Sequence, residues 1–395
     1  MFRFLVSTLL LVHLAVLVWV AWGLPIGPNE AVLYFSDNSI VSWLMHGGKA
    51  LFPTLDFLNM RLPFLIIHLI NLLLFYRLSR YFLKDDRALL TSFIIFLFLP
   101  GIVSSAVLAT TTGIILALYQ TFLILFLEKK RVAALAVLSL FLFIDKSSVI
   151  LYFAIFTYAL WKRDGALLLF VTFLFGASVS LYGFGIHGKP VNYFADTIGM
   201  YAAIFSPLLF LYFFYAVYRI LFKGDKNIIW HISFTVLVLS LIISLRQRIP
   251  IQDFAPYVIV AIPLMVQLFF QSFSVRLPQF RRPYRMMAWM VFSVLFINTA
   301  LLLFHKPLFL LLDQPEKHFA KPFYYPYWCA QALKNNGIHT ILVDKRELTL
   351  QLRYYGILPK GNLKLQEKAC ETCKKVSIRY KNRNLKSCYV SKINN

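Results

Sequence analysis

The sequence predicts an all-α polytopic membrane protein of about eleven transmembrane helices, followed by a small extracytoplasmic α/β domain at the C-terminus. Hydrophobic residues make up 59% of the 395 residues and charged residues only 14%, well below the roughly 25% of an ordinary soluble domain. The mean hydropathy is +0.70. Apolar runs that approach the roughly 20 residues needed to cross a bilayer recur between residues 4 and 312.

The apolar runs define the predicted spans. The first run exceeds the roughly 7–15 apolar residues of a signal peptide and lacks a clear cleavage site, so we interpret it as a retained span. In order, the spans are 4–22, 61–83, 88–107, 110–127, 132–145, 147–161, 165–185, 200–222, 228–245, 254–274 and 285–312.

Lysine and arginine residues are concentrated in alternate loops. Short cytoplasmic loops carry an excess of these residues, so eleven spans with a cytoplasmic N-terminus place all five basic loops on one side. The transmembrane domain then covers residues 1–312, with a first outer loop at 23–60, and the extracytoplasmic domain covers 313–395. The basic loops are centred on Arg77–Arg87, Lys129–Arg131, Lys162–Arg163, Lys223–Lys226 and Arg276–Arg285.

The C-terminal segment has the pattern of a small α/β unit. Helices are expected over 325–337 and 345–356, each closed by a glycine at its C-terminal end. Strands are expected over 338–344, 374–380 and 387–393. The segment carries 16 Lys and Arg against 6 Asp and Glu, which suits either contact with anionic lipid headgroups or a merely solvated surface.

The cysteines of this segment predict a structural disulfide. Cys370 and Cys373 have CxxC spacing, Cys388 follows them, and Cys329 precedes them. Disulfides form readily outside the cytoplasm, so one or two bridges are expected, with Cys370, Cys373 and Cys388 as the candidates. A zinc site and a redox motif are the less favoured alternatives.

Ionisable and polar residues gather on the predicted outer face. Polar groups close to the bilayer are costly, and they often carry function. Acids and bases from separate loops would suit a site where cations hold a phosphate and a carboxylate accepts a proton. The set comprises Asn29, Glu30, Asp37, His46, Lys49, Asp56, Arg61, Thr110–Thr112, Asp145, Lys146, His187, Lys189, Arg246, Arg248 and Asp253.

Several members of this set also have a structural interpretation. Arg61 begins a span and would snorkel there, while Asp145 and Lys146 would form a local ion pair. Asp37 would cap the helix that follows it, and His46 would be an ordinary interfacial residue.

Four segments resemble bacterial lipid-linked-sugar glycosyltransferases of the GT-C superfamily, in particular the aminoarabinose lipid A transferase and protein O-mannosyltransferase-like proteins. The resemblance extends over nearly the whole chain through short motifs. The segments are PNEAVLYFSDNSIVSWL (28–44), RLPFLIIHLINLLLFYRLSRYF (61–82), FIDKSSVILYFAIF (143–156) and IHTILVDKRELTLQLRYYG (338–356).

The resemblance implies an integral-membrane glycosyltransferase of the bacterial inner membrane with a periplasmic C-terminal domain. Such an enzyme moves a sugar from a polyprenyl-phosphate-linked donor to an acceptor on the outer face. Membrane lipid, the donor and a glycan, lipid A or protein acceptor are the expected partners. No cofactor is implied, and a divalent metal is not indicated.

The resemblance also suggests roles for individual residues. Two acids of the family are replaced here, by Asn29 and within the Thr110–Thr112 segment, which moves the expected base to Glu30 with Asp37 in reserve. The phosphate contact expected from the resemblance is Lys146. Arg246 and Arg248 are candidates by their predicted topology rather than by a motif, and Arg61 completes the expected phosphate contacts. The expected substrate contacts are Asn29, His46 and Lys189.

Two other functions fit parts of the pattern. A lipid or glycan transporter or flippase would place charges at mid-membrane depth, whereas the spans here are mostly free of them. A non-catalytic GT-C-like scaffold would explain the missing acids. Nucleic-acid binding is disfavoured despite the net charge of +23, because the basic residues lie in loops and in the tail, without a nucleic-acid module.

Overall fold

The protein is described here from a computed structural model. It describes residues 2–35, 39–183, 191–312, 314, 317–366, 374–380 and 383–392. The chain divides into two compact units. Unit 1 comprises residues 1–13, 64–106 and 110–300, and unit 2 comprises 14–63, 107–109 and 301–395. The first outer loop and the C-terminal segment therefore belong to the same unit.

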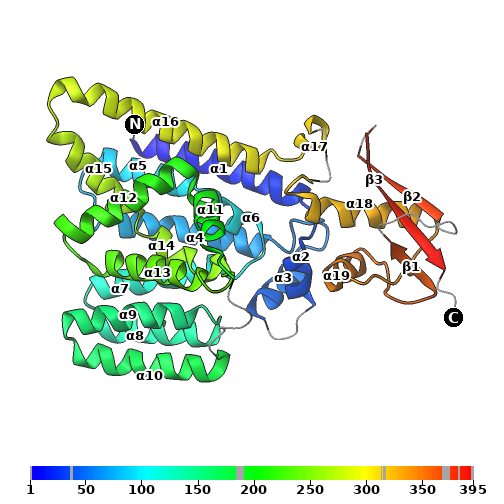
Figure 1. The fold of residues 1–395 in the computed structure, drawn as a ribbon, viewed down its shortest axis with the longest axis horizontal. Helices are drawn as coiled ribbons and strands as arrows, with labels where there is room; N and C mark the ends of the chain where they lie inside the picture. Colours follow the sequence, from blue (N-terminus) through cyan, green and yellow to red (C-terminus); the bar gives the residue numbers. More distant parts are fainter. Residues whose placement is uncertain are drawn as a thin grey trace. The chain divides into compact units, whose positions relative to one another are not determined.

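The described chain is mostly helical and carries a small C-terminal sheet, which confirms the predicted fold class (Figure 1). Among the described residues, five helices are long and apolar enough to cross a membrane, or up to seven if each bent pair is one span, fewer than the eleven predicted. By length and composition, five candidate spans are α1 (Phe2–Gly23), α4 (Leu62–Ser79), α10 (Gly165–Tyr182), α14 with α15 (Ala255–Ile259 and Ile262–Ser274) and α16 (Pro278–Leu303). Two bent pairs are α5 with α6 (Asp86–Leu97 and Pro100–Val107) and α11 with α12 (Phe194–Phe205 and Pro207–Lys223). Four shorter apolar helices are α7 (Thr112–Leu127), α8 with η1 (Arg131–Leu140 and Phe141–Phe143), α9 (Ser148–Lys162) and α13 (Ile228–Ser244).

Proline accounts for the position of both bends. Pro100 begins α6 and Pro207 begins α12. A proline lacks the backbone N–H that would continue the preceding helix, but it is tolerated in the first turn of the next one. The axes of the two pairs turn by 54° and 105°. At the sharper bend Ser206 has φ 77°, a left-handed conformation that is uncommon for a residue other than glycine.

The core of unit 1 is mainly apolar and aromatic. The rings of Phe75 and Phe96 stack with centroids 3.8 Å apart. Asn71 is a buried polar residue of this core that finds partners: its amide donates to the Gly113 carbonyl oxygen at 2.9 Å and accepts from Gln120 at 3.1 Å. Such bonds satisfy groups that would otherwise be costly to bury away from water.

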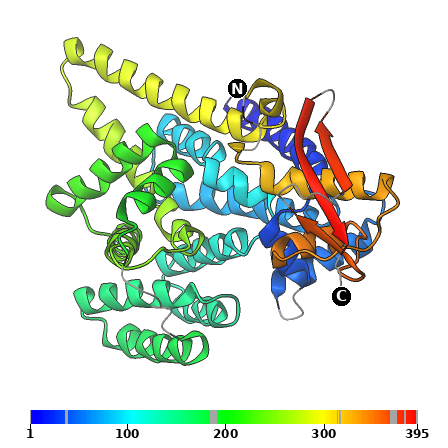
Figure 2. The same ribbon diagram turned by 45° about the vertical axis from the view of Figure 1, so that its right-hand side comes forward.

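Unit 2 carries a three-stranded antiparallel sheet with helices beside it (Figure 2). The strands are β1 (Leu363–Gln366), β2 (Lys374–Tyr380) and β3 (Arg383–Lys392), in the order β1-β3-β2. The helices are α2 (Pro28–Tyr34), α3 (Ile40–Leu51), α17 (Leu308–Leu311), α18 (Lys321–Asn335) and α19 (Arg346–Tyr354).

The predicted helices and the last two strands of the C-terminal segment are present. Gly337 and Gly356 follow α18 and α19 with φ 73° and 82°, conformations in which glycine avoids steric cost. The expected strand at 338–344 is reduced to isolated bridges, and β1 was not predicted.

Helix α19 is hydrogen-bonded to the start of the first outer loop. The Gln351 side chain donates to the Ile26 carbonyl oxygen at 2.8 Å. The Ile26 N–H donates to the Tyr355 hydroxyl oxygen at 3.0 Å. These contacts join segments more than 320 residues apart in sequence and hold the loop that contains Glu30.

Candidate functional site

Glu30 lies in the first turn of α2, where the local sequence explains its position. Pro28 begins the helix, and Gly27 is its N-cap residue. The Glu30 carboxylate folds back and accepts a hydrogen bond from the Gly27 N–H at 2.7 Å. This reciprocal arrangement satisfies a backbone donor that the helix itself leaves without a partner.

Arg61 makes the principal contact of this carboxylate. Its side chain is fully buried, and the Glu30 side chain is 3% exposed. The guanidinium forms a bidentate pair with the carboxylate, a geometry that suits the planar Arg side chain. Its five N–H groups have five acceptors: Nε donates to Glu30 Oε1 at 3.1 Å, Nη2 to Glu30 Oε2 at 2.6 Å and Pro25 O at 2.9 Å, and Nη1 to Ala21 O at 3.2 Å and Leu24 O.

The hydrogen bonds of this pair leave little capacity for a substrate. Glu30 Oε1 also accepts from the Ala109 N–H at 2.8 Å, so each carboxylate oxygen accepts two hydrogen bonds, its ordinary capacity. Arg61 does not snorkel to the surface, and its five donors all point at protein oxygens. The roles of Glu30 as a base and Arg61 as a phosphate contact remain predictions from the resemblance.

The other predicted residues of the first loop lie in different surroundings. Asn29 is exposed, one position before Glu30. His46 Nε2 lies 3.0 Å from the Tyr34 carbonyl oxygen, so it helps to join α2 to α3. The N-cap of α3 is Ser39, whose hydroxyl accepts from the Val41 N–H. Asp37, the expected cap and reserve base, lies outside the described residues.

A cationic and aromatic cluster in unit 2 was not predicted. The Lys49 ammonium donates to the Tyr34 hydroxyl at 3.2 Å and lies 5.1 Å from the centroid of the Tyr354 ring. Arg353 lies 4.6 Å from the centroid of the Phe35 ring. Cations over aromatic rings attract the π-electron face. No local sequence pattern indicates this cluster, because α19 is distant from the first loop in the chain.

Lys146, in unit 1, lines a cavity of about 290 Å³ together with Asp253. The Lys146 ammonium lies 3.7 Å from Asp253 Oδ2, and the Lys146 side chain is 62% exposed. Asp145 interacts with Lys146 through the backbone, where the Lys146 N–H donates to Asp145 Oδ1 at 2.8 Å. The described ion pair of Lys146 is therefore with Asp253, a member of the predicted outer-face set to which no specific role was assigned.

The pKa of the Asp253 carboxyl is raised toward neutral pH. Its side chain is 7% exposed, and this burial is the main reason that its pKa is raised to about 6. The nearby Asp145 carboxylate acts in the same direction, and the Lys146 ammonium opposes both. Burial also raises the pKa of Asp145. A carboxyl with a pKa close to the working pH is suited to general base catalysis.

The side chains of the other two predicted phosphate contacts in unit 1 are exposed. Arg246 and Arg248 are exposed, and they alternate with Gln247 and Ile249, which line the 290 Å³ cavity. Within the described part of the chain, neither arginine side chain forms an ion pair. Lys189 lies outside the described residues.

The cysteines leave the disulfide prediction open. Cys370 and Cys373 lie outside the described residues. The sulfur of Cys388 in β3 lies 3.8 Å from that of Cys329 in α18, farther than the roughly 2.05 Å of a disulfide bond. Among the described residues, no group of three or more His, Cys, Asp or Glu side chains is placed to hold a metal ion.

Comparison with solved structures shows which fold the chain shares. No protein-family model and no curated protein sequence matches it. The structure of ArnT from Cupriavidus metallidurans bound to undecaprenyl phosphate aligns with a TM-score of 0.56, over 98% of this chain and 97% of that chain, at 11% identity. The apo structure of the same ArnT aligns with a TM-score of 0.53, over 98% of both chains, at 10% identity. The predicted resemblance is thus confirmed at the level of the fold, which this chain shares with ArnT over nearly its whole length.

Proposed function

We propose that this protein is an integral-membrane glycosyltransferase that uses a polyprenyl-phosphate-linked sugar on the outer face of the membrane. The observation that carries the proposal is the shared fold, which extends over 98% of the chain to a structure bound to undecaprenyl phosphate. The acceptor is a lipid, a glycan or a protein hydroxyl. Lipid A is included among these acceptors through the family resemblance.

Lys146 would hold the phosphate of the donor. Its exposed ammonium at the 290 Å³ cavity has only one described carboxylate partner, at 3.7 Å. A phosphate oxygen would therefore compete for this cation at modest cost. The charge that develops on the departing polyprenyl phosphate would be stabilised there. Arg246 and Arg248 would contribute further positive charge from the neighbouring loop.

Asp253 would act as the general base. The acceptor oxygen attacks the anomeric carbon of the sugar, and the bond from that carbon to the donor phosphate oxygen breaks. The proton of the acceptor hydroxyl passes to the Asp253 carboxylate, and polyprenyl phosphate leaves. The raised pKa of about 6 would leave this group mostly ionised at pH 7 and basic enough to take the proton.

Glu30 and Arg61 would stabilise the first outer loop within unit 2 and would not act on the reacting atoms. Their mutual hydrogen bonds fix the end of α1 and the first turn of α2. This assignment replaces Glu30 by Asp253 as the preferred base. It also removes the need for an acid at Asn29.

The test is complementation of a strain that lacks the gene. The glycolipids of each strain are extracted, and their masses are measured by mass spectrometry. We expect deletion to remove one sugar from a surface lipid or glycan. The wild type and Lys129→Gln, a control on the opposite side of the predicted topology, should restore it. Asp253→Asn and Lys146→Gln should not, although each is present in membranes at wild-type level. Full restoration by Asp253→Asn would remove this residue from the mechanism.

A non-catalytic scaffold is the second candidate, favoured by the full hydrogen-bonding of Glu30 and by Asn29 in place of an acid. If the protein is such a scaffold, Asp253→Asn and Lys146→Gln should both complement the deletion strain, because only the folded chain is needed. An unchanged glycolipid profile after deletion would likewise contradict the transferase. Accumulation of the unmodified lipid in the inner leaflet would instead indicate a flippase.

A further inference from the structure

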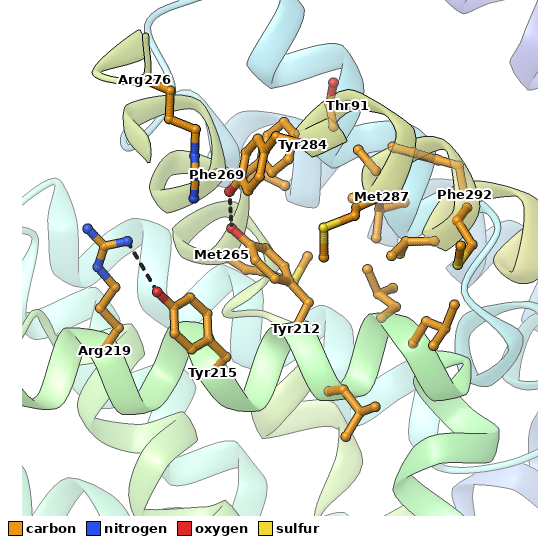
Figure 3. A pocket seen from close by; sticks show the side chains of 18 residues that line it. Thr91, Tyr212, Tyr215, Arg219, Met265, Phe269, Arg276, Tyr284, Met287 and Phe292 are labelled. Atoms are coloured by element: carbon orange, nitrogen blue, oxygen red, sulfur yellow. Dashed lines mark hydrogen bonds between the residues drawn. The ribbon is translucent and has the colours of Figure 1, made fainter. Parts of the chain in front are cut away.

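A second, larger cavity lies within unit 1, apart from the residues discussed so far. Its volume is about 490 Å³, within the roughly 300–1,000 Å³ of small-molecule sites. Four helices line it: α5, α12, α15 and α16. Leu, Ile, Val, Met and Phe side chains form most of its wall (Figure 3).

The charged groups and the tyrosine hydroxyl groups of this cavity lie toward one end. Figure 3 shows Arg219 and Arg276 on the same side, with Met287 and Phe292 at the other. Between them the hydroxyl groups of Tyr212 and Tyr284 lie 3.3 Å apart. The cavity is therefore amphipathic along its length, cationic at one end and apolar at the other.

Both guanidinium groups retain unused donors. Arg219 Nη1 donates to the Ser272 hydroxyl at 2.9 Å and to the Tyr215 hydroxyl at 3.4 Å. Arg276 stacks over the Tyr284 ring, 4.1 Å from its centroid. Neither forms an ion pair with a carboxylate in the described part of the chain. Two guanidinium groups with spare donors that line the same end of one cavity favour an anion with several acceptor oxygens.

The surrounding charge favours the same kind of ligand. The segments that flank the cationic end contain more bases than acids. The acids are Asp225 and, at the start of α5, Asp85 and Asp86. The predicted topology places this end in the cytoplasmic leaflet, where anionic lipids are concentrated and basic pockets between helices bind their headgroups. The bases are Arg219, Lys223, Lys226, Arg276, Arg281, Arg282 and Arg285.

We propose that this cavity binds one anionic phospholipid, with its phosphate between Arg219 and Arg276 and one acyl chain in the apolar part. The lipid would bridge α12 and α16 on the face opposite the proposed transfer site. An acyl chain suits a cavity of about 490 Å³ better than a long polyprenyl chain. Free phosphate would satisfy the arginines alone and leave the apolar wall uncovered.

The first test uses the wild-type, full-length protein, delipidated in detergent and titrated with phosphatidylglycerol or phosphatidylcholine. Native mass spectrometry counts the bound lipids. Both lipids carry an anionic phosphate, but the choline cation of phosphatidylcholine repels the two arginines and has no hydroxyl group to donate or accept a hydrogen bond. We therefore expect one phosphatidylglycerol to bind about tenfold or more tightly than phosphatidylcholine. Equal binding of the two lipids would overturn the proposal, as would displacement of phosphatidylglycerol by millimolar inorganic phosphate.

The second test localises the binding. Arg219→Gln/Arg276→Gln should abolish the preference for phosphatidylglycerol. Lys223→Gln/Arg282→Gln, which removes the same charge from the same region outside the cavity lining, should preserve it. Ala288→Trp should fill the apolar part and prevent binding, whereas Ala300→Trp, on an exposed position of α16, should not. Loss of the preference in the Lys223/Arg282 control, or retention in Ala288→Trp, would refute the site.

Discussion

At the scale of single residues, the Glu30–Arg61 pair is the most completely hydrogen-bonded charged group that the structure describes. We expect Glu30→Ala or Arg61→Ala to lower the free energy of unfolding by about 3–5 kcal/mol, because each leaves the other charge buried without its partner. Chemical denaturation in mixed micelles measures the loss.

Two comparisons make this prediction specific. Asn29→Ala, one residue away on the exposed side of α2, should change stability by less than about 0.5 kcal/mol. The double variant Glu30→Ala/Arg61→Ala should cost less than the sum of the single variants, because no unpaired charge remains. Additive losses would show that the two side chains stabilise the loop independently.

Asp253 gives a prediction for the pH dependence of transfer. A general base acts in its ionised form, and the pKa of this carboxyl is raised to about 6 by burial. The rate at low substrate should therefore fall tenfold per pH unit below about pH 6 and level off above it. Asp253→Glu, which keeps a carboxylate, should retain a similar profile at lower rate. A flat profile between pH 5 and 7 in the wild type would exclude this base.

At the scale of an element, α3 depends on close contact with the segment that follows it. A Cβ atom added to Gly48 would lie 2.3 Å from the Asn59 carbonyl oxygen, whereas one added to the adjacent Gly47 would meet nothing within 4 Å. Gly48→Ala should therefore destabilise the first loop by about 1–3 kcal/mol through overpacking. The readout is cleavage of the first loop by protease in proteoliposomes.

Gly47→Ala is the matched control for α3. Alanine favours a helix interior over glycine by up to about 1 kcal/mol, so this variant should resist the protease as well as the wild type or better. Equal cleavage of Gly47→Ala and Gly48→Ala would mean that helix propensity, not the approach to Asn59, determines the stability of α3.

The elements themselves were largely predictable from the sequence, whereas their contacts were not. Apolar length predicted the spans, and glycine predicted the ends of α18 and α19, because both signals are local. The partnership of Glu30 with Arg61 joins residues 31 positions apart, and that of Gln351 with Ile26 joins residues 325 apart. Hydrophobic patterning carries no information on such pairings.

The same distinction explains the candidate site. Sequence reasoning identified Lys146 from its loop and from the family resemblance, but paired it with the adjacent Asp145. The fold places Asp253, more than a hundred residues later, near the Lys146 ammonium. Its raised pKa arises from burial, which only the packed structure reveals.

At the scale of the whole molecule, the predicted orientation assigns every proposed role to a side of the membrane. The basic loops should be cytoplasmic and residues 313–395 extracytoplasmic, because short basic loops are retained inside while long domains are exported regardless of charge. Alkaline phosphatase folds only outside the cytoplasm, so it should be active when fused after residue 395. Green fluorescent protein fused at the same position should not fluoresce, because it would be exported with the C-terminal domain. Both reporters inserted between Lys223 and Lys226 should behave in the opposite way. An active phosphatase in that loop would invert the topology, moving the Lys146–Asp253 cavity to the cytoplasmic side and the arginine-lined cavity to the outer leaflet.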